Sequence, residues 1–257
     1  GADVSVVAIH EGGYTDAKVL GQECSGINGD IVPILERLDP SVDVVVSGHT
    51  HQAYVCDYGR INPARPFLLT SAGQYGALLT EVSLRVDTAT RQVVRKTAHN
   101  HIVQGEAFTG SQGLVPLNAA VPAYPADPFV QQLVARYKAA AEPLAQRPVG
   151  RASAPLLRVR NVADGQLAAT RAPQKGGAQL SFMNPGGLRA DLVPDAQGQL
   201  RYGQLFSVQP FGNNIMVRTY TGAQIRAVLE QQFAGGTSTP QSPRVLSVSE
   251  GFGYRYD

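Results

Sequence analysis

Apolar residues in the first hundred positions form short runs that polar turns separate. Runs at 4–9 and 67–70 predict strands, and 42–46 is nearly continuous in apolar character, as in a sheet covered on both faces. Residues 79–86 alternate apolar and polar side chains, which is typical of a strand with one exposed face. Residues 30–38 fit a short helix that tolerates Pro33 in its first turn. This order of strands and helix predicts an α/β layered domain.

A change of composition separates this region from the rest of the chain. Residues 105–128 are rich in Gly, Pro, Ala and Ser, which predicts a linker. Asp127 and Pro128 then begin a helix with one apolar face, which we expect to end at Pro143. Beyond it the pattern predicts a second domain of mixed strands and helices, with strands at 178–183, 205–208 and 214–219 and a helix at 222–233.

Composition restricts the class of protein. A length of 257 residues suits two domains, and 43% hydrophobic residues are enough for two cores. The net charge of +2 comes with scattered basic residues, so we expect no nucleic-acid partner. No run approaches the ~18–20 apolar residues of a membrane-spanning helix. Cys24 and Cys56 are either reduced thiols or a disulfide; we favour the disulfide, which would place the protein outside the cytoplasm.

Three of the five histidines directly follow predicted strands. His10 lies in Ile-His-Glu-Gly-Gly at 9–13, and His49 and His51 lie in Ser-Gly-His-Thr-His at 47–51. In open α/β sheets, ligands bind outside the carboxyl ends of the strands. An extended His-x-His pair sends its side chains to opposite faces, so each can serve one of two metals ~3.5–4 Å apart. We expect Gly48 to allow a close backbone approach at this bend.

The alternative for these histidines is that they are polar strand-end residues facing solvent. Three histidines at two strand ends favour metal ligands over that alternative. His99 and His101 differ, because they alternate within 93–103, which predicts a polar-faced strand or hairpin arm. We interpret those two as surface residues.

The motifs around the three histidines resemble a known superfamily. Val-Val-Val-Ser-Gly-His-Thr-His at 44–51 resembles the last motif of calcineurin-like metallophosphoesterases, and 9–13 resembles the preceding histidine motif. Residues 29–36 and 70–76 (Thr-Ser-Ala-Gly-Gln-Tyr-Gly) are similar to the 5′-nucleotidase branch. The resemblance implies two divalent metal ions such as zinc or manganese, with His10 and His49 on one ion and His51 on the other.

The sequence also departs from that family. The family's Asp-x-His and Gly-Asn-His-Asp/Glu motifs, the second of which holds its acid–base pair, do not occur. The family's second stacking aromatic, in a Gly-Asp-Gly-Phe type loop, is also absent. We therefore assign no catalytic residue. We expect the sequence to be truncated at both ends relative to the family and the metal site to be incomplete.

Residues in the second predicted domain resemble nucleotide-binding motifs. Asn184 and Arg189 flank a Gly-rich turn, and an arginine fork suits phosphate or carboxylate, although a surface turn with a solvated Arg explains that motif better when it is taken alone. Together with Gln-Pro-Phe-Gly-Asn-Asn at 209–214, it resembles the Asn-x-Gly-Gly-x-Arg and Pro-Phe-Gly-Asn motifs of the 5′-nucleotidase carboxy-terminal domain. That implies nucleotide contacts by Asn184 and Arg189 and stacking of the base on Phe211. Residues 157–167 loosely resemble a further family segment, which implies a phosphate contact by Arg158, with Arg160 as the second choice.

The expected fold is therefore α/β and α+β. Residues 1–125 would be the C-terminal half of a four-layer α/β/β/α metallophosphoesterase domain, and 126–257 a linker helix and an incomplete mixed α/β nucleotide-binding domain. The expected function is periplasmic or extracellular two-metal hydrolysis of nucleoside 5′-monophosphates. Alternatives are a 2′,3′-cyclic-nucleotide phosphodiesterase/3′-nucleotidase, a UDP-sugar or NAD hydrolase, and a non-catalytic nucleotide-binding module.

Overall fold

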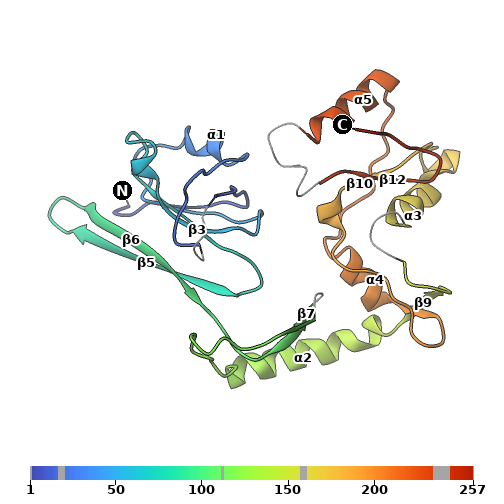
Figure 1. The fold of residues 1–257 in the computed structure, drawn as a ribbon, viewed down its shortest axis with the longest axis horizontal. Helices are drawn as coiled ribbons and strands as arrows, with labels where there is room; N and C mark the ends of the chain where they lie inside the picture. The colour runs from blue at the N-terminus through green and yellow to red at the C-terminus, as the bar shows by residue number, and fades with distance from the viewer. Residues whose placement is uncertain (1, 17–20, 111–112, 157–160, 234–243, 257) are drawn as a thin grey trace. The chain divides into compact units, whose positions relative to one another are not determined.

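The structure, a computed structural model, describes residues 2–16, 21–110, 113–156, 161–233 and 244–256. The chain divides into two compact units, Gly1–Asp127 and Pro128–Asp257 (Figure 1). Each unit has its own cluster of buried apolar side chains. Both units mix helices and strands, so the protein is of the mixed α/β class.

A four-stranded sheet organises the first unit. Its order is β1 (Val6–Ala8), β2 (Val44–Val46), β4 (Leu68–Ala72) and β3 (Ala53–Asp57). The first three strands are parallel, and β3 runs antiparallel to β4 at the edge. The carboxyl ends of β1 and β2 therefore meet at one edge of the sheet, since Ala8 pairs with Val46.

The core of the first unit lies under α1 (Val32–Leu35) and a 3-10 turn, η1 (Tyr58–Arg60). Tyr58 is fully buried and stacks on Phe67 with ring centroids 5.1 Å apart. Its hydroxyl donates to Glu36 Oε1 at 2.6 Å. Burial, together with this carboxylate, raises the pKa of Tyr58 well above its usual range. The other buried members of this core are Ile31, Leu35, Val42, Val45, Tyr54, Cys56 and Leu69.

A long antiparallel hairpin follows, formed by β5 (Leu78–Asp87) and β6 (Gln92–Ile102) (Figure 1). The alternation predicted for 79–86 is confirmed, because intermediate and exposed residues alternate along β5. Asn100 ties the hairpin to the rest of the unit: it is buried, and its Nδ2 donates to Gly21 O at 2.9 Å and Ser71 O at 3.0 Å. A short pair, β7 (Phe108–Gly110) and β8 (Gly113–Val115), completes the unit.

The second unit begins with α2 (Pro128–Ala145). Two antiparallel pairs, β9 (Pro148–Arg151) with β11 (Gln199–Arg201) and β10 (Phe182–Met183) with β12 (Ser247–Val248), form its small sheets. Its buried core contains Ala163, Met183, Leu188, Leu192, Leu200 and Val208. The remaining elements are α3 (Asn161–Thr170), η2 (Pro173–Lys175), η3 (Pro185–Gly187), α4 (Tyr202–Val208) and α5 (Gly222–Gln231).

Several predicted elements of this unit are wrong in type or length. The strand predicted at 205–208 is the last part of α4, because a segment of four residues with three apolar side chains fits either element and the Gln204 side chain caps the backbone N–H of Arg201 at 2.7 Å. Residues 214–219 form no strand, and only the last two residues of 178–183 do. The helix continues past Pro143 to Ala145, since a proline so near the end removes little hydrogen bonding.

None of the helices in the described ranges is both long enough and apolar enough to span a bilayer.

Candidate functional site

Two loops at the carboxyl ends of β1 and β2 bring His10 and His49 together. The hydrogen bonding between β1 and β2 continues one residue past the end of β1, where Ile9 N donates to Val46 O at 2.9 Å. Gly48 N then donates to Glu11 O at 3.1 Å, which joins the loops directly. His10 Nε2 and His49 Nδ1 lie 3.2 Å apart, with ring centroids at 5.0 Å. Both imidazoles are exposed, so solvent and ligands can reach them.

The backbone at His49 and His51 is not extended, contrary to the sequence-based expectation. Both residues have a positive φ, 65° and 61° respectively. Non-glycine residues in the left-handed region are strained by roughly 1–3 kcal/mol and cluster at functional sites. The two rings are therefore separated by a bend, not by alternation along a strand. His51 lies beside Tyr75, with ring centroids 6.2 Å apart.

Gly12, and not Gly48, is the glycine that permits the close approach of the loops. A Cβ added to Gly12 would lie 2.1 Å from Gly48 O and 2.6 Å from Thr50 Oγ1. A Cβ added to Gly48 would meet nothing closer than His10 Nδ1 at 3.9 Å. The expectation for Gly48 is therefore wrong, and Gly12 is the position at which a side chain would collide with the other loop.

Buried hydroxyl groups hold the loops that carry His10 and His49 in place. Tyr54 OH lies 2.6 Å from Ser47 Oγ and accepts from Gly13 N at 3.1 Å, so one side chain of β3 contacts both loops. Ser47 Oγ in turn donates to Thr70 O at 2.8 Å. Thr50 Oγ1 closes the outer side by donating to Gly13 O at 2.9 Å. The histidine pair therefore lies on a preorganised backbone.

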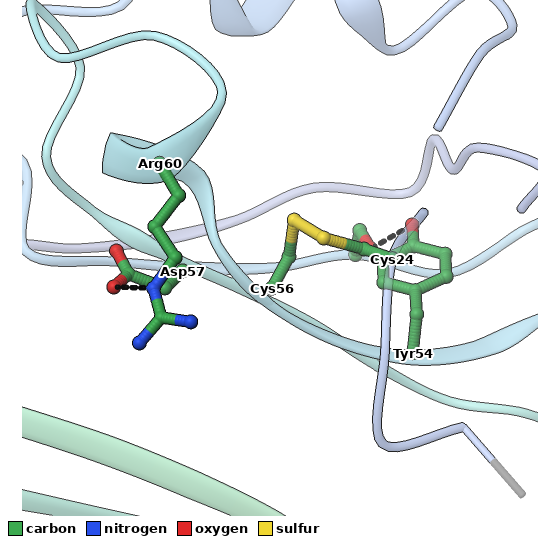
Figure 2. Close-up of a disulfide and its surroundings, with 6 residues drawn as sticks. Cys24, Tyr54, Cys56, Asp57 and Arg60 are labelled. Carbon is green, nitrogen blue, oxygen red and sulfur yellow. Dashed lines mark hydrogen bonds and ion pairs between the residues drawn. A yellow bond between two sulfur atoms is a disulfide. The ribbon is translucent and has the colours of Figure 1, made fainter. Parts of the chain in front are cut away.

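A disulfide reinforces the strand that carries Tyr54. Cys24 and Cys56 are bridged, with Cα atoms 5.2 Å apart, which confirms the favoured prediction and makes the free-thiol alternative wrong. Figure 2 shows Tyr54 and Cys56 two positions apart on β3, with the bridge reaching across to Cys24. The bridge therefore anchors the loop around Cys24 to the strand beneath the histidines.

The spacing of the histidine pair fits one metal ion. Two nitrogens bound at 2.0–2.1 Å to a tetrahedral ion lie roughly 3.3–3.4 Å apart, and His10 Nε2 and His49 Nδ1 are 3.2 Å apart. Within the part of the chain that the structure describes, no group of three or more His, Cys, Asp or Glu side chains is arranged to hold a metal. Two nitrogens are fewer than the three or four protein ligands of a typical zinc site.

A cavity of about 730 Å³ in the second unit brings the predicted nucleotide-binding residues together. Asn184 and Phe211 line it. The Arg189 guanidinium carbon lies 5.9 Å from the centroid of the Phe211 ring, and its Nη1 donates to Gly186 O at 3.3 Å. Phe211 remains 53% exposed, so its side chain is accessible to solvent. Arg158 and its alternative Arg160 lie outside the described residues.

Sequence reasoning missed most of the polar wall of this cavity. Gln166 and Gln209 line it, and both direct their Nε2 toward Met183 Sδ, at 3.4 and 3.5 Å. Ser181 Oγ donates to Gln166 Oε1 at 3.1 Å. Residues 213–220 form another wall, as an irregular segment where a strand was expected. A glutamine amide does not by itself indicate a binding site in a sequence. Of these two glutamines, only Gln209 lies within a motif, because it precedes Pro210 and Phe211.

The second unit is similar to a known family of domains. Residues 146–257 match the family described as 5′-nucleotidase, C-terminal domain. The resemblance inferred from the motifs is therefore confirmed for this part of the chain.

Two relatives in Bacillus subtilis (strain 168) match most of the chain. One, named endonuclease YhcR, is 25% identical over 248 residues, which is 92% of this chain and 17% of the relative. The other, named trifunctional nucleotide phosphoesterase protein YfkN, is 27% identical over 240 residues, 87% of this chain and 15% of the relative. The chain thus spans less than a fifth of either relative.

A solved structure supports the fold. A candidate 5′-nucleotidase from Staphylococcus aureus, in complex with alpha-ketoglutarate, matches with a TM-score of 0.52 and 14% identity, over 90% of this chain and 41% of that chain. At this identity the similarity concerns the fold alone.

Proposed function

We propose that the chain is part of a two-metal phosphoesterase that hydrolyses nucleoside 5′-monophosphates. In this proposal residues 1–125 are the C-terminal half of a metallophosphoesterase domain, and 126–257 are the linker helix and the substrate-binding domain. The names of the relatives, one of them a nucleotide phosphoesterase, support the class of substrate. The alternatives with cyclic nucleotides, UDP-sugars or NAD share the same fold and metals.

The observation that carries the proposal is the Arg189–Phe211 pair beside the cavity. Phe211 offers an apolar ring for stacking a base, and Arg189 lies against that ring with a charge suited to phosphate. The Asn184 amide can both donate and accept hydrogen bonds at the same cavity. A planar ring joined to an anion matches this combination of a stacking surface, an amide and a cation.

The metals would be held by the first unit. His10 and His49 would ligate one ion through the facing nitrogens, and His51 would ligate the second. When bound, such ions polarise a phosphoryl oxygen and lower the pKa of bound water. The role of the chain is to hold the two imidazoles at the spacing of cis ligands, which the Gly12 and Tyr54 contacts do. Of the two expected metals, zinc fits imidazole donors better than manganese does, because manganese prefers oxygen ligands.

A non-catalytic nucleotide-binding module is the second candidate. The finding that favours it is that no group of three metal ligands lies within the described ranges. We also propose a periplasmic or extracellular location, because the disulfide requires an oxidising compartment to form and persist.

The test measures the binding of AMP by calorimetry, for the chain and for its Phe211→Leu variant. Stacking on one aromatic ring is worth ~1–3 kcal/mol, so the substitution should weaken binding by roughly 5- to 150-fold. Phe206→Leu is the matched control, because Phe206 is also 53% exposed but does not line the cavity. Equal effects of the two substitutions, or none for Phe211→Leu, would refute the nucleotide site.

A further inference from the structure

The outer face of the β5–β6 hairpin carries a second cluster of imidazoles, outside both sites described above. His99 and His101 lie two positions apart on β6, and both are exposed. Side chains at this spacing lie on the same face of a strand. Their ring centroids are 4.6 Å apart. Glu81 faces His99 directly across the hairpin, and its Oε2 lies 2.9 Å from His101 Nε2.

We propose that His99 and His101 form a two-imidazole binding site for a divalent transition-metal ion, copper(II) above all. Two imidazoles bound at 2.0–2.1 Å to one ion have ring centres roughly 4.5–5.2 Å apart for bond angles between 90° and 109°. The observed 4.6 Å lies near the right-angle end of that range, which suits the square-planar geometry of copper(II). Rotation of the His99 ring about χ2, a broad torsion in histidine, lets its nitrogen turn toward an ion bound at His101.

Glu81 acts in this site as a positioning residue and not as a ligand. Its carboxylate lies at Nε2 of His101 and leaves Nδ1 of the same ring for the metal. A carboxylate hydrogen-bonded to the far nitrogen of a ligating histidine fixes the tautomer and makes the ring more basic. This arrangement agrees with the finding that no set of three ligands exists within the described residues, because only two side chains bind and water completes the coordination.

The hairpin provides a rigid base for the two rings. Asn100, the residue between them, points to the other face and is buried, with hydrogen bonds to Gly21 O and Ser71 O. The backbone that carries both histidines is therefore held in place from the inner side. The site is independent of the proposed phosphoesterase function.

The experiment separates this site from the loop histidines. The chain contains five histidines, so the variant His10→Ala/His49→Ala/His51→Ala leaves His99 and His101 as its imidazoles. Electron paramagnetic resonance of this variant with one equivalent of copper(II) should show coupling to two imidazole nitrogens. Copper(II) should bind more tightly than zinc.

Substitutions within that variant then test each residue. His99→Thr or His101→Thr should weaken copper binding more than tenfold, and Glu81→Gln about tenfold. Thr keeps the strand propensity, and circular dichroism verifies that the hairpin remains folded. Thr97→Ala, on the same exposed face, is the control and should change nothing. A spectrum without imidazole coupling, or unchanged affinity in both histidine variants, would overturn the site; unchanged affinity in Glu81→Gln would remove the role of Glu81.

Discussion

His49 and His51 illustrate which properties of a single residue can be predicted from the sequence and which are set by the folded structure. Their type and position after an apolar run could be predicted from the sequence, because parallel strands end at one edge of a sheet. Their left-handed backbone could not, since a positive φ at a non-glycine residue depends on tertiary contacts. The same holds for Gly12, whose missing side chain matters only because the carbonyl of Gly48 lies beside it.

The close approach at Gly12 leads to a prediction. Gly12→Ala places a Cβ where the Gly48 carbonyl lies, so the two histidine loops must move apart. We expect the substitution to lower the free energy of unfolding by about 1–3 kcal/mol, measured by urea denaturation, and to abolish the contact between His10 and His49. Gly105→Ala is the control in the same unit, because its Cβ would meet only Tyr124 O at an ordinary 3.8 Å. If both variants unfold at the same urea concentration as the wild type, the packing of the loops is looser than we describe.

At the scale of elements, pattern strength decided which predictions were right. The strands at β1, β2 and β5 and the helix α5 were predicted because their apolar pattern is regular or their turns are well marked. The strand predicted at 205–208 was wrong because four residues, three of them apolar, are too few to show a period, and the capping by Gln204 acts from outside the segment. The strand predicted at 214–219 was wrong because these residues line a cavity, and an apolar run in the sequence does not distinguish that role from a strand.

The disulfide is the element-scale feature with the clearest energetic consequence. It joins residues 32 positions apart, and a loop of that length corresponds to about 3–4 kcal/mol of stabilisation through the unfolded chain. We expect the denaturation midpoint of the first unit to fall when reductant is added. In Cys24→Ala/Cys56→Ala the midpoint should already be low and should not respond to reductant. A wild-type midpoint that reductant leaves unchanged would mean that the bridge does not form in the folded protein.

At the scale of the whole molecule, the sequence motifs predicted more of the functional site than the pattern of apolar and polar residues did. Asn184 and Phe211 are 27 positions apart, yet both line one cavity, with Arg189 beside Phe211, and only the family resemblance linked the three beforehand. The amide of Gln166 could not be predicted, because no motif marks it, and the contact of Gln166 and Gln209 with Met183 arises only on folding. The role of Arg158 stays a prediction, since it lies outside the described residues.

The last prediction concerns catalysis by these 257 residues alone. Two-metal hydrolysis needs several ligands for each ion and a general acid near the leaving group. The two histidine loops offer one imidazole pair at ligand spacing, and the described residues contain no group of three ligands. We therefore expect no measurable release of phosphate from AMP, even with added manganese or zinc. AMP should still bind at the cavity of Asn184 and Phe211, with an affinity no better than about 10⁻⁴ M, because one stacking face contributes only ~1–3 kcal/mol.

The measurement is a phosphate-release assay run beside the binding titration on one preparation, with a chelator added to half of each sample. Binding that persists in chelator, without turnover in either half, is the expected result, because the cavity lies in the second unit and the histidine loops lie in the first. The His49→Ala variant should behave like the wild type in both assays. Phosphate release that the chelator stops and His49→Ala removes would show that the residues of this chain complete an active site, and that its acid–base group lies among side chains to which we assign no role.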